Sequence, residues 1–254
     1  MRTWQRPRPA RSPFLGLVAL LTLLVPLVAS AEWIDLGGDV PLEVQLLSSD
    51  ETSSVYAITV GGFEATPVKV DDDTWYEITL PGAPQALVFG FPSLPMVRRA
   101  LAIPDDRAVV ANIIESEHVD LPDLPVAPSK GNLLRSVDPA MVAYQFDAFY
   151  QTSGLWPERV VEADAPHIVR DLRGVVVQAN PFQYLPGSDV LRVHTRIVVE
   201  VRDAGPGQIN VLERQRPFTA VDPQFARLYE SHFLNHDALR YDTVEETGGL
   251  LIEY

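Results

Sequence analysis

The chain has 254 residues, 46% of them apolar, and its 20 basic and 34 acidic side chains give a net charge of −14 at pH 7. Such an acidic chain is unsuited to binding nucleic acid or anionic lipid through bulk electrostatic attraction. It contains no cysteine, which excludes a disulfide scaffold, a thiol nucleophile and a cysteine metal site, so its stability has to come from a hydrophobic core.

The first 31 residues have the layout of a secretory signal peptide. Four arginines precede an apolar stretch over residues 14–28, and Ala29-Ser30-Ala31 forms an A-x-A cleavage site. A membrane anchor is the alternative, but the stretch is shorter than the roughly 20 residues that span a bilayer, and it contains Pro26. We therefore expect cleavage between Ala31 and Glu32, no lasting membrane insertion, and a secreted or extracellular protein, periplasmic in transit. Its net charge would be −18, because 16 basic residues then face 34 acidic ones.

Beyond residue 31, apolar and polar residues alternate in short runs that turn residues separate. Tyr56–Val60 and Tyr76–Leu80 each place three apolar side chains on one face. In the longest run, Asp189–Val201, His194 is expected on the outer, polar face. The inner face of that run is expected to carry Leu191, Val193, Thr195, Ile197, Val199 and Val201. This pattern predicts an all-β fold, an antiparallel β-sandwich or jelly roll.

Two segments depart from the alternation. Asp120–Asn132 contains three prolines and no alternating apolar residues, which predicts a long exposed loop. Near the C-terminus, Asp222 as N-cap and Pro223 in the first turn predict an amphipathic helix that ends at Asn235 or just after it. Its apolar face is expected to hold Phe225, Leu228, Tyr229 and Phe233.

The sequence contains no recognisable catalytic constellation: G-x-S-x-G, H-E-x-x-H and glycine-rich phosphate loops are absent. His232 and His236 are spaced to chelate a metal, with Glu230 or Asp237 nearby, but two solvent-facing histidines are the favoured interpretation. Asp71-Asp72-Asp73 either binds calcium weakly or forms a solvated turn, which is favoured because no spaced ligand loop follows. We therefore predict no catalytic residue, no metal site and no cofactor.

Two stretches carry a resemblance to a known family. One is Gly90-Phe91-Pro92-Ser93-Leu94-Pro95, which runs into Leu101-Ala102-Ile103-Pro104. The other is Arg173-Gly174-Val175-Val176-Val177, which continues through Asn180-Pro181-Phe182-Gln183-Tyr184 to Leu191-Arg192-Val193. In this order, downstream of a secretion signal, they resemble the N-terminal pro-region of the gingipain-type cysteine peptidases.

The resemblance implies a β-sandwich propeptide domain over residues 32–240, acting in cis as inhibitor and folding assistant of a peptidase domain until it is cut away. Residues 241–254 would be a linker and the first strand of that peptidase domain, whose catalytic cysteine would lie beyond Tyr254. On this interpretation the chain itself is not an enzyme, although a longer gene product would be a cysteine endopeptidase.

The resemblance also implies a processing site. In the family, an arginine precedes a mature N-terminus that reads Tyr-x-x-Val-Glu-Glu; here Arg240 precedes Tyr241, and Val244-Glu245-Glu246 stands in the later positions. The implied cut lies between Arg240 and Tyr241, with Arg214 and Arg216 as weaker candidates.

Lys130 and Arg135 are the candidate inhibitory residues. A basic side chain on a proline-stiffened loop is what a substrate-like inhibitor presents to a specificity pocket, because proline lowers the cost of ordering the loop. An ordinary surface lysine is the alternative. A different class of function, a secreted carbohydrate- or surface-binding module, would use Trp33, Trp75 and Trp156 as a platform, with Trp75 on the outer face of its strand.

Overall fold

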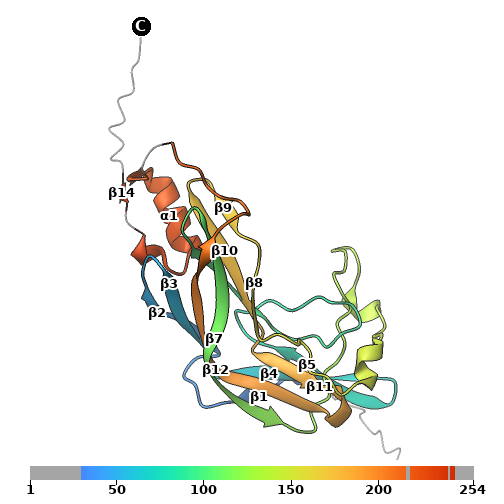
Figure 1. The fold of residues 1–254 in the computed structure, drawn as a ribbon. Coiled ribbons are helices and arrows are strands. Elements are labelled where there is room, and N and C mark those ends of the chain that lie inside the picture. Colours follow the sequence, from blue (N-terminus) through green and yellow to red (C-terminus); the bar gives the residue numbers. More distant parts are fainter. Residues whose placement is uncertain (1–29, 216–217, 240, 244–254) are drawn as a thin grey trace, which may run out of the picture.

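A computed structural model describes residues 30–215, 218–239 and 241–243 of the chain (Figure 1). The described elements are, in chain order, β1 (Glu32–Asp35), β2 (Leu42–Ser49), β3 (Ser53–Val60), β4 (Gly62–Val70), β5 (Asp73–Thr79), β6 (Val97–Ala102), β7 (Arg107–Leu121), the 3₁₀ turns η1 (Pro139–Met141) and η2 (Ala148–Gln151), β8 (Val161–Ala163), β9 (His167–Val169), β10 (Leu172–Ala179), β11 (Phe182–Leu185), η3 (Pro186–Ser188), β12 (Val190–Pro206), β13 (Ala220–Val221), α1 (Pro223–His232), η4 (His236–Ala238) and β14 (Asp242–Thr243).

The strands form antiparallel sheets, as predicted. One sheet has the order β11-β12-β3-β2, with β7 also paired to β12; a second has the order β1-β4-β5, and a third has β6-β10-β8 with β9 on β10. The short pair β13 and β14 is parallel. Within the described residues, no helix is long and apolar enough to cross a membrane.

β12 supplies side chains to both main cores. Leu191 and Val193, near its start, pack with residues of β4, β5 and β11 in a first core. Ile197 and Val199, further along, pack with residues of β3, β6 and β10 in a second core. Each such fully buried side chain contributes about 1.5–3 kcal/mol through removal from water, so the period-two pattern of this strand identifies the main source of stability.

His194 is buried, at 7% exposure, and its predicted place on the outer face is wrong. A β-bulge between His194 and Arg196 interrupts the pairing of β12 with β7, and Thr195, expected to face inward, is only half-buried. The backbone N–H of His194 donates to the carbonyl of Pro181, just before β11 (2.7 Å). Alternation alone does not reveal such a bulge.

Both ring nitrogens of His194 have partners. Nε2 lies 3.0 Å from Gln183 Oε1, and Nδ1 lies 2.8 Å from Ser116 Oγ. The amide oxygen only accepts, so Nε2 carries the proton and Nδ1 accepts from the serine hydroxyl, which describes a neutral imidazole. Burial, together with the nearby His118 and Arg192, lowers the pKa of His194 to about 4.

Asp120–Asn132 is not a long exposed loop. Its first two residues end β7, and Leu124, Val126 and Ala127 are buried. The backbone pairs with Tyr76 of β5: the Tyr76 N–H donates to the Pro125 carbonyl and the Ala127 N–H donates to the Tyr76 carbonyl, both at 2.8 Å. Proline has no N–H donor, so Pro125 takes part in this pairing only through its carbonyl, and the segment shows no strand-like alternation.

The predicted helix is present and begins as expected, with Asp222 Oδ1 accepting from the Gln224 N–H (2.8 Å). It ends at His232, three residues earlier than predicted, because the next residues extend along β6. There the Leu234 N–H donates to the Ala100 carbonyl (2.8 Å), and the buried Asn235 amide bonds both the N–H (2.8 Å) and the carbonyl (2.9 Å) of Ala102.

The apolar face of α1 differs from the predicted one. Tyr229 and Phe233 are buried, whereas Leu228 is 41% exposed. Tyr229 and Phe233 form a third core with Ala100, Ala102, Leu172 and Val221. The helix therefore docks through a narrower face than helical spacing predicted.

Acidification should destabilise the domain through His194. The pKa of this group is lower in the folded chain than the ordinary 6.5, so between pH 6.5 and about 4 the unfolded chain binds the proton that the folded chain refuses. Stability is then fully present above pH 6.5 and falls as the pH falls, by up to about 3 kcal/mol. Urea unfolding from pH 7.5 to 4 measures this loss. It should shrink in His194→Gln and persist in His118→Gln; an equal loss in His194→Gln contradicts the assignment.

Truncation of the helix face should separate its buried and exposed residues. Phe233→Ala is expected to lower the free energy of unfolding by about 3–5 kcal/mol, since it opens a cavity in the third core. Leu228→Ala is the matched control, with a change of less than about 1 kcal/mol because its side chain is partly solvated and lies outside the third core. Chemical denaturation of both variants is the measurement, and similar losses would contradict this description of the face.

Candidate functional site

The Gly90–Pro95 motif ties together two later segments of the chain. The Gly90 N–H donates to the Ser129 carbonyl (2.9 Å), and the Gly90 carbonyl accepts from the Asp147 N–H (3.0 Å). Gly90 has φ of 80°, and an added Cβ would lie 3.3 Å from the Asp147 nitrogen, so a side chain would be strained here. The motif therefore fixes both ends of residues 130–146, which we call the basic loop.

The basic loop is stiffened by contacts within it and at its end. Asp138 accepts from the Ala140 N–H and caps η1 inside the loop, and Asp147, just after the loop, accepts from the Phe149 N–H and caps η2, both at 2.9 Å. The Lys130 Nζ donates to the Pro139 carbonyl (2.9 Å) and lies 4.0 Å from the centroid of the Tyr144 ring. Figure 1 shows the loop as a yellow-green excursion beside β5 and β11.

The structure gives the two predicted inhibitory residues different surroundings. Lys130 is half-buried and committed to the contacts inside the loop. Arg135 is exposed, and within the described part of the chain its guanidinium has no salt bridge and no hydrogen bond. Arg135 is therefore the basic side chain that is available to a partner.

Exposed apolar side chains occur in the same loop as Arg135 and in the segment just before Gly90. We call the following set the loop surface: Leu87, Val88, Phe89, Leu134, Val137, Met141 and Phe146. The two contributing segments meet where Phe89 lies against Gly131. Leu134 is 76% exposed and Met141 is 83% exposed, and large apolar groups gathered in this way mark interaction sites. The sequence contains a signal for this surface: large apolar residues occur in turn-rich stretches without the alternation of a buried strand.

The tryptophans do not form the platform that a sugar-binding module needs. Trp75 is half-buried rather than solvent-exposed, because its ring packs against Phe146, at 4.7 Å between centroids. Trp156 packs against Phe91, at 4.3 Å between centroids. Trp33 is exposed, but it lies on β1 against Gly62, away from the other two. The alternative of a binding module is therefore not favoured.

The segment after the predicted processing site lies at the other end of the molecule, beside α1 (Figure 1). Tyr241 is half-buried, and its hydroxyl lies 2.6 Å from His236 Nε2. Burial, and to a lesser degree the charge of Glu230, raises the pKa of this tyrosine. Arg240 and Arg216 lie outside the described residues, whereas Arg214 is bound to Asp105 by hydrogen bonds and a salt bridge.

The other residues singled out in the sequence lie in a turn, at the start of a strand and near the end of α1. Asp71-Asp72 forms the turn between β4 and β5. β1 begins at Glu32, the residue after the predicted signal cleavage. His236 lies beyond the end of α1, and His232 instead has its Nε2 3.3 Å from that of His167. Among the residues that the structure describes, no group of three or more metal-ligating side chains occurs.

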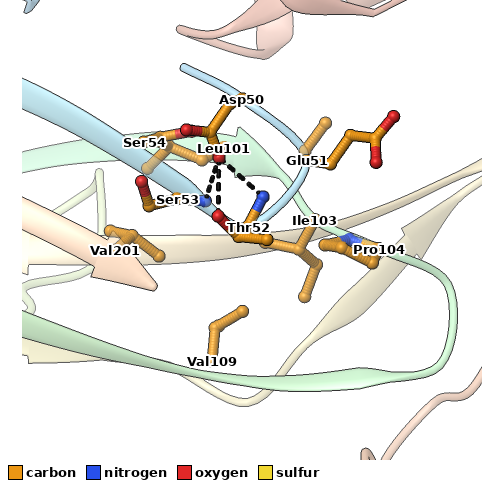
Figure 2. A pocket seen from close by; sticks show the side chains of 11 residues that line it. Asp50, Glu51, Thr52, Ser53, Ser54, Leu101, Ile103, Pro104, Val109 and Val201 are labelled. Atoms are coloured by element: carbon orange, nitrogen blue, oxygen red, sulfur yellow. Dashed lines mark hydrogen bonds between the residues drawn. The ribbon is translucent and has the colours of Figure 1, made fainter. Parts of the chain in front are cut away.

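A small cavity lies at the turn between β2 and β3 and has a volume of about 20 Å³. Figure 2 shows that Asp50 caps this turn: its Oδ1 accepts from the Thr52 N–H (2.7 Å), the Thr52 hydroxyl (2.8 Å) and the Ser53 N–H (2.9 Å). These backbone hydrogen bonds lower the pKa of Asp50. The space holds about one water molecule, so the carboxylate serves the turn and not a ligand.

A larger cavity of about 410 Å³ borders Arg173. This guanidinium is 1% exposed and donates to the carbonyls of Pro104, Arg107, Ile209 and Asn210 at 2.5–2.9 Å. Burial lowers the pKa of Arg173. Four of its five N–H donors join the β6–β7 turn to the chain after β12, which gives this arginine a structural role. The sequence contained this residue in a motif without revealing its structural role.

Comparison with known proteins identifies the class. The family model Propeptide_C25 matches residues 34–232, so the chain belongs to the Propeptide_C25 family. It is a propeptide of the gingipain type, which confirms the predicted resemblance, and not the catalytic part of such an enzyme; its sequence contains no cysteine.

Among similar curated proteins, Gingipain R2 of Porphyromonas gingivalis (strain ATCC 33277) is 31% identical over 207 residues, which cover 80% of this chain and 27% of that protein. Lys-gingipain HG66 of the same species is 25% identical over 177 residues, 67% of this chain and 10% of that protein. The chain thus spans about a quarter of the length of Gingipain R2, or less in other relatives.

Two solved structures share the fold. The complex of Porphyromonas gingivalis RgpB pro- and mature domains contains a chain with a TM-score of 0.70 and 29% identity, covering 77% of this chain and 97% of that one. A structure of gingipain K from Porphyromonas gingivalis, described in terms of zymogenic latency, has a TM-score of 0.59 over 69% of this chain and 100% of that one. At 20% identity the second shows the fold alone.

Proposed function

We propose that this domain inhibits a gingipain-type cysteine peptidase by presenting Arg135 to its specificity pocket, and assists its folding, until it is cut away. The observation that carries the proposal is an exposed, uncommitted arginine on a stiff loop that also carries exposed apolar side chains. The RgpB structure, in which a pro-domain and a mature domain form a complex, supports a peptidase as the partner.

The loop geometry fits a competitive mechanism. Because the Lys130 contact, the capped turns and the Gly90 anchor hold the basic loop in one arrangement, little conformational entropy is lost when it binds. The loop surface would cover the apolar rim of the cleft while Arg135 enters the pocket. Binding would then be strongest for a peptidase that accepts arginine on the acyl side of the scissile bond.

Replacement of the arginine should abolish most of the inhibition. Arg135→Ala is expected to raise the inhibition constant about 30-fold or more, since an acidic pocket would lose its buried partner. The assay adds the purified chain to the mature domain of Gingipain R2 with a peptide substrate. Arg227→Ala, an exposed arginine on α1, is the matched control and should not change the constant. Lys130→Ala should have a smaller effect through loosening of the loop.

We also propose that the product is exported, with signal cleavage between Ala31 and Glu32, and that residues 32–240 are released by a cut between Arg240 and Tyr241. Residues 241–254 would then begin the peptidase domain in cis. The Tyr-x-x-Val-Glu-Glu pattern and the similarity to gingipain pro-regions support this cut.

The processing proposal predicts that Arg240→Gln prevents the appearance of a fragment beginning at Tyr241. The chain is incubated with the mature domain of Gingipain R2, and the new N-termini are identified by mass spectrometry. An arginine-specific peptidase requires the guanidinium in its pocket, whereas Arg227→Gln leaves the junction unchanged and should be cut normally. A Tyr241 fragment in Arg240→Gln would move the cut elsewhere.

A further inference from the structure

We infer that the folded domain withholds its own processing junction, because it holds the residues on both sides of Arg240 in structures that a peptidase cleft does not accept. This inference rests on the cut proposed between Arg240 and Tyr241. It adds a step to that proposal: the end of the domain must open before the bond can be cut.

On the N-terminal side of the junction, the chain is coiled rather than extended. His236–Ala238 forms η4, with the Ala238 N–H donating to the Asn235 carbonyl (3.1 Å) and the Leu239 N–H donating to the His236 carbonyl (2.8 Å). Asn235 is itself buried against β6. Peptidases bind the residues before the scissile bond as an extended strand, which requires these turns to unwind.

On the C-terminal side, the side chain of Tyr241 is seated in the domain. Its ring centroid lies 5.4 Å from that of Phe218 and 6.2 Å from that of Tyr229. Its hydroxyl lies 2.6 Å from His236 Nε2. Tyr229 is in turn fixed by its hydroxyl, 3.1 Å from Asp171 Oδ2. We call Phe218, Tyr229 and His236 the tyrosine seat.

The backbone after Tyr241 is also paired. β14 runs parallel to β13, with Asp242 opposite Ala220 and Thr243 opposite Val221, and the Asp242 N–H donates to the Thr219 carbonyl (2.8 Å). Val221 is buried in the third core. To bind both flanks of the junction, a peptidase must unwind η4, remove Tyr241 from the tyrosine seat and separate β14 from β13. The cutting rate therefore follows the small population of molecules in which this end of the domain is open.

Trypsin tests this inference without the natural peptidase, since it cuts after exposed arginines. The purified chain is digested at limiting trypsin, and mass spectrometry follows two fragments, one beginning at Ser136 after the exposed Arg135 and one beginning at Tyr241. We expect the Tyr241 fragment to appear much more slowly than the Ser136 fragment in the folded chain, and at a comparable rate in urea-unfolded chain.

Variants in the seat should open the junction without changing the bond that is cut. His236→Ala and Phe218→Ala are each expected to speed the appearance of the Tyr241 fragment about three- to tenfold. The Ser136 fragment should keep its rate and serves as an internal control. His118→Ala, which changes an exposed histidine on β7, should leave both rates unchanged. A thermal melt confirms that each variant is folded.

Two outcomes would overturn the inference. One is a folded wild-type chain in which the Tyr241 fragment forms as fast as in urea; the other is unchanged cutting after Arg240 in both seat variants. Neither outcome bears on the natural cutting position, which Arg240→Gln tests with the mature domain of Gingipain R2. Failure of this inference can therefore be distinguished from failure of the processing proposal.

Discussion

The pairing of β12 is the constraint on which the rest of the domain depends. This strand, Val190–Pro206, is hydrogen-bonded to β3, β7 and β11, and so connects elements that are far apart in sequence. Its first half contributes side chains to the first core, and its second half contributes side chains to the second core. The register shift between His194 and Arg196 lies where the strand passes from the first core to the second.

The two ends of the molecule are built on opposite principles. At one end, the Gly90 motif and Lys130 use up their polar groups inside the basic loop, which leaves Arg135 and the loop surface facing outward. At the other end, η4, the tyrosine seat and β13–β14 make their hydrogen bonds and packing contacts within the domain, which leaves little free backbone for a partner to bind. The first arrangement suits recognition of a peptidase, and the second suits slow cutting of the processing junction. Both properties fit the proposed role, in which the domain binds a peptidase and is cut only later.

The sequence predicted those features that depend on neighbours along the chain. The alternation in Tyr56–Val60 and Asp189–Val201 identified core strands, and Asp222 with Pro223 marked the start of α1. The misses all depend on contacts between distant segments. Asp120–Asn132 is buried because β5 offers it backbone partners, and Leu228 is exposed because the third core is narrow. Arg173 and Asn235 bind backbone groups of other elements, and no spacing in a single sequence reveals such contacts. The same holds for the candidate site: the sequence suggested Lys130 and Arg135 together, and only the contact of Lys130 with Pro139 separated them.

The extension of residues 233–235 along β6 has a consequence for solubility. β6 ends its sheet, since β10 pairs with only one of its sides, and a free sheet edge is a template for pairing with another chain. The Leu234 N–H and the Asn235 amide occupy backbone groups of Ala100 and Ala102 on that open side. These contacts would thereby hinder edge-to-edge self-association of the chain. Truncating the domain at the end of α1 would expose this edge, and we expect it to favour aggregation.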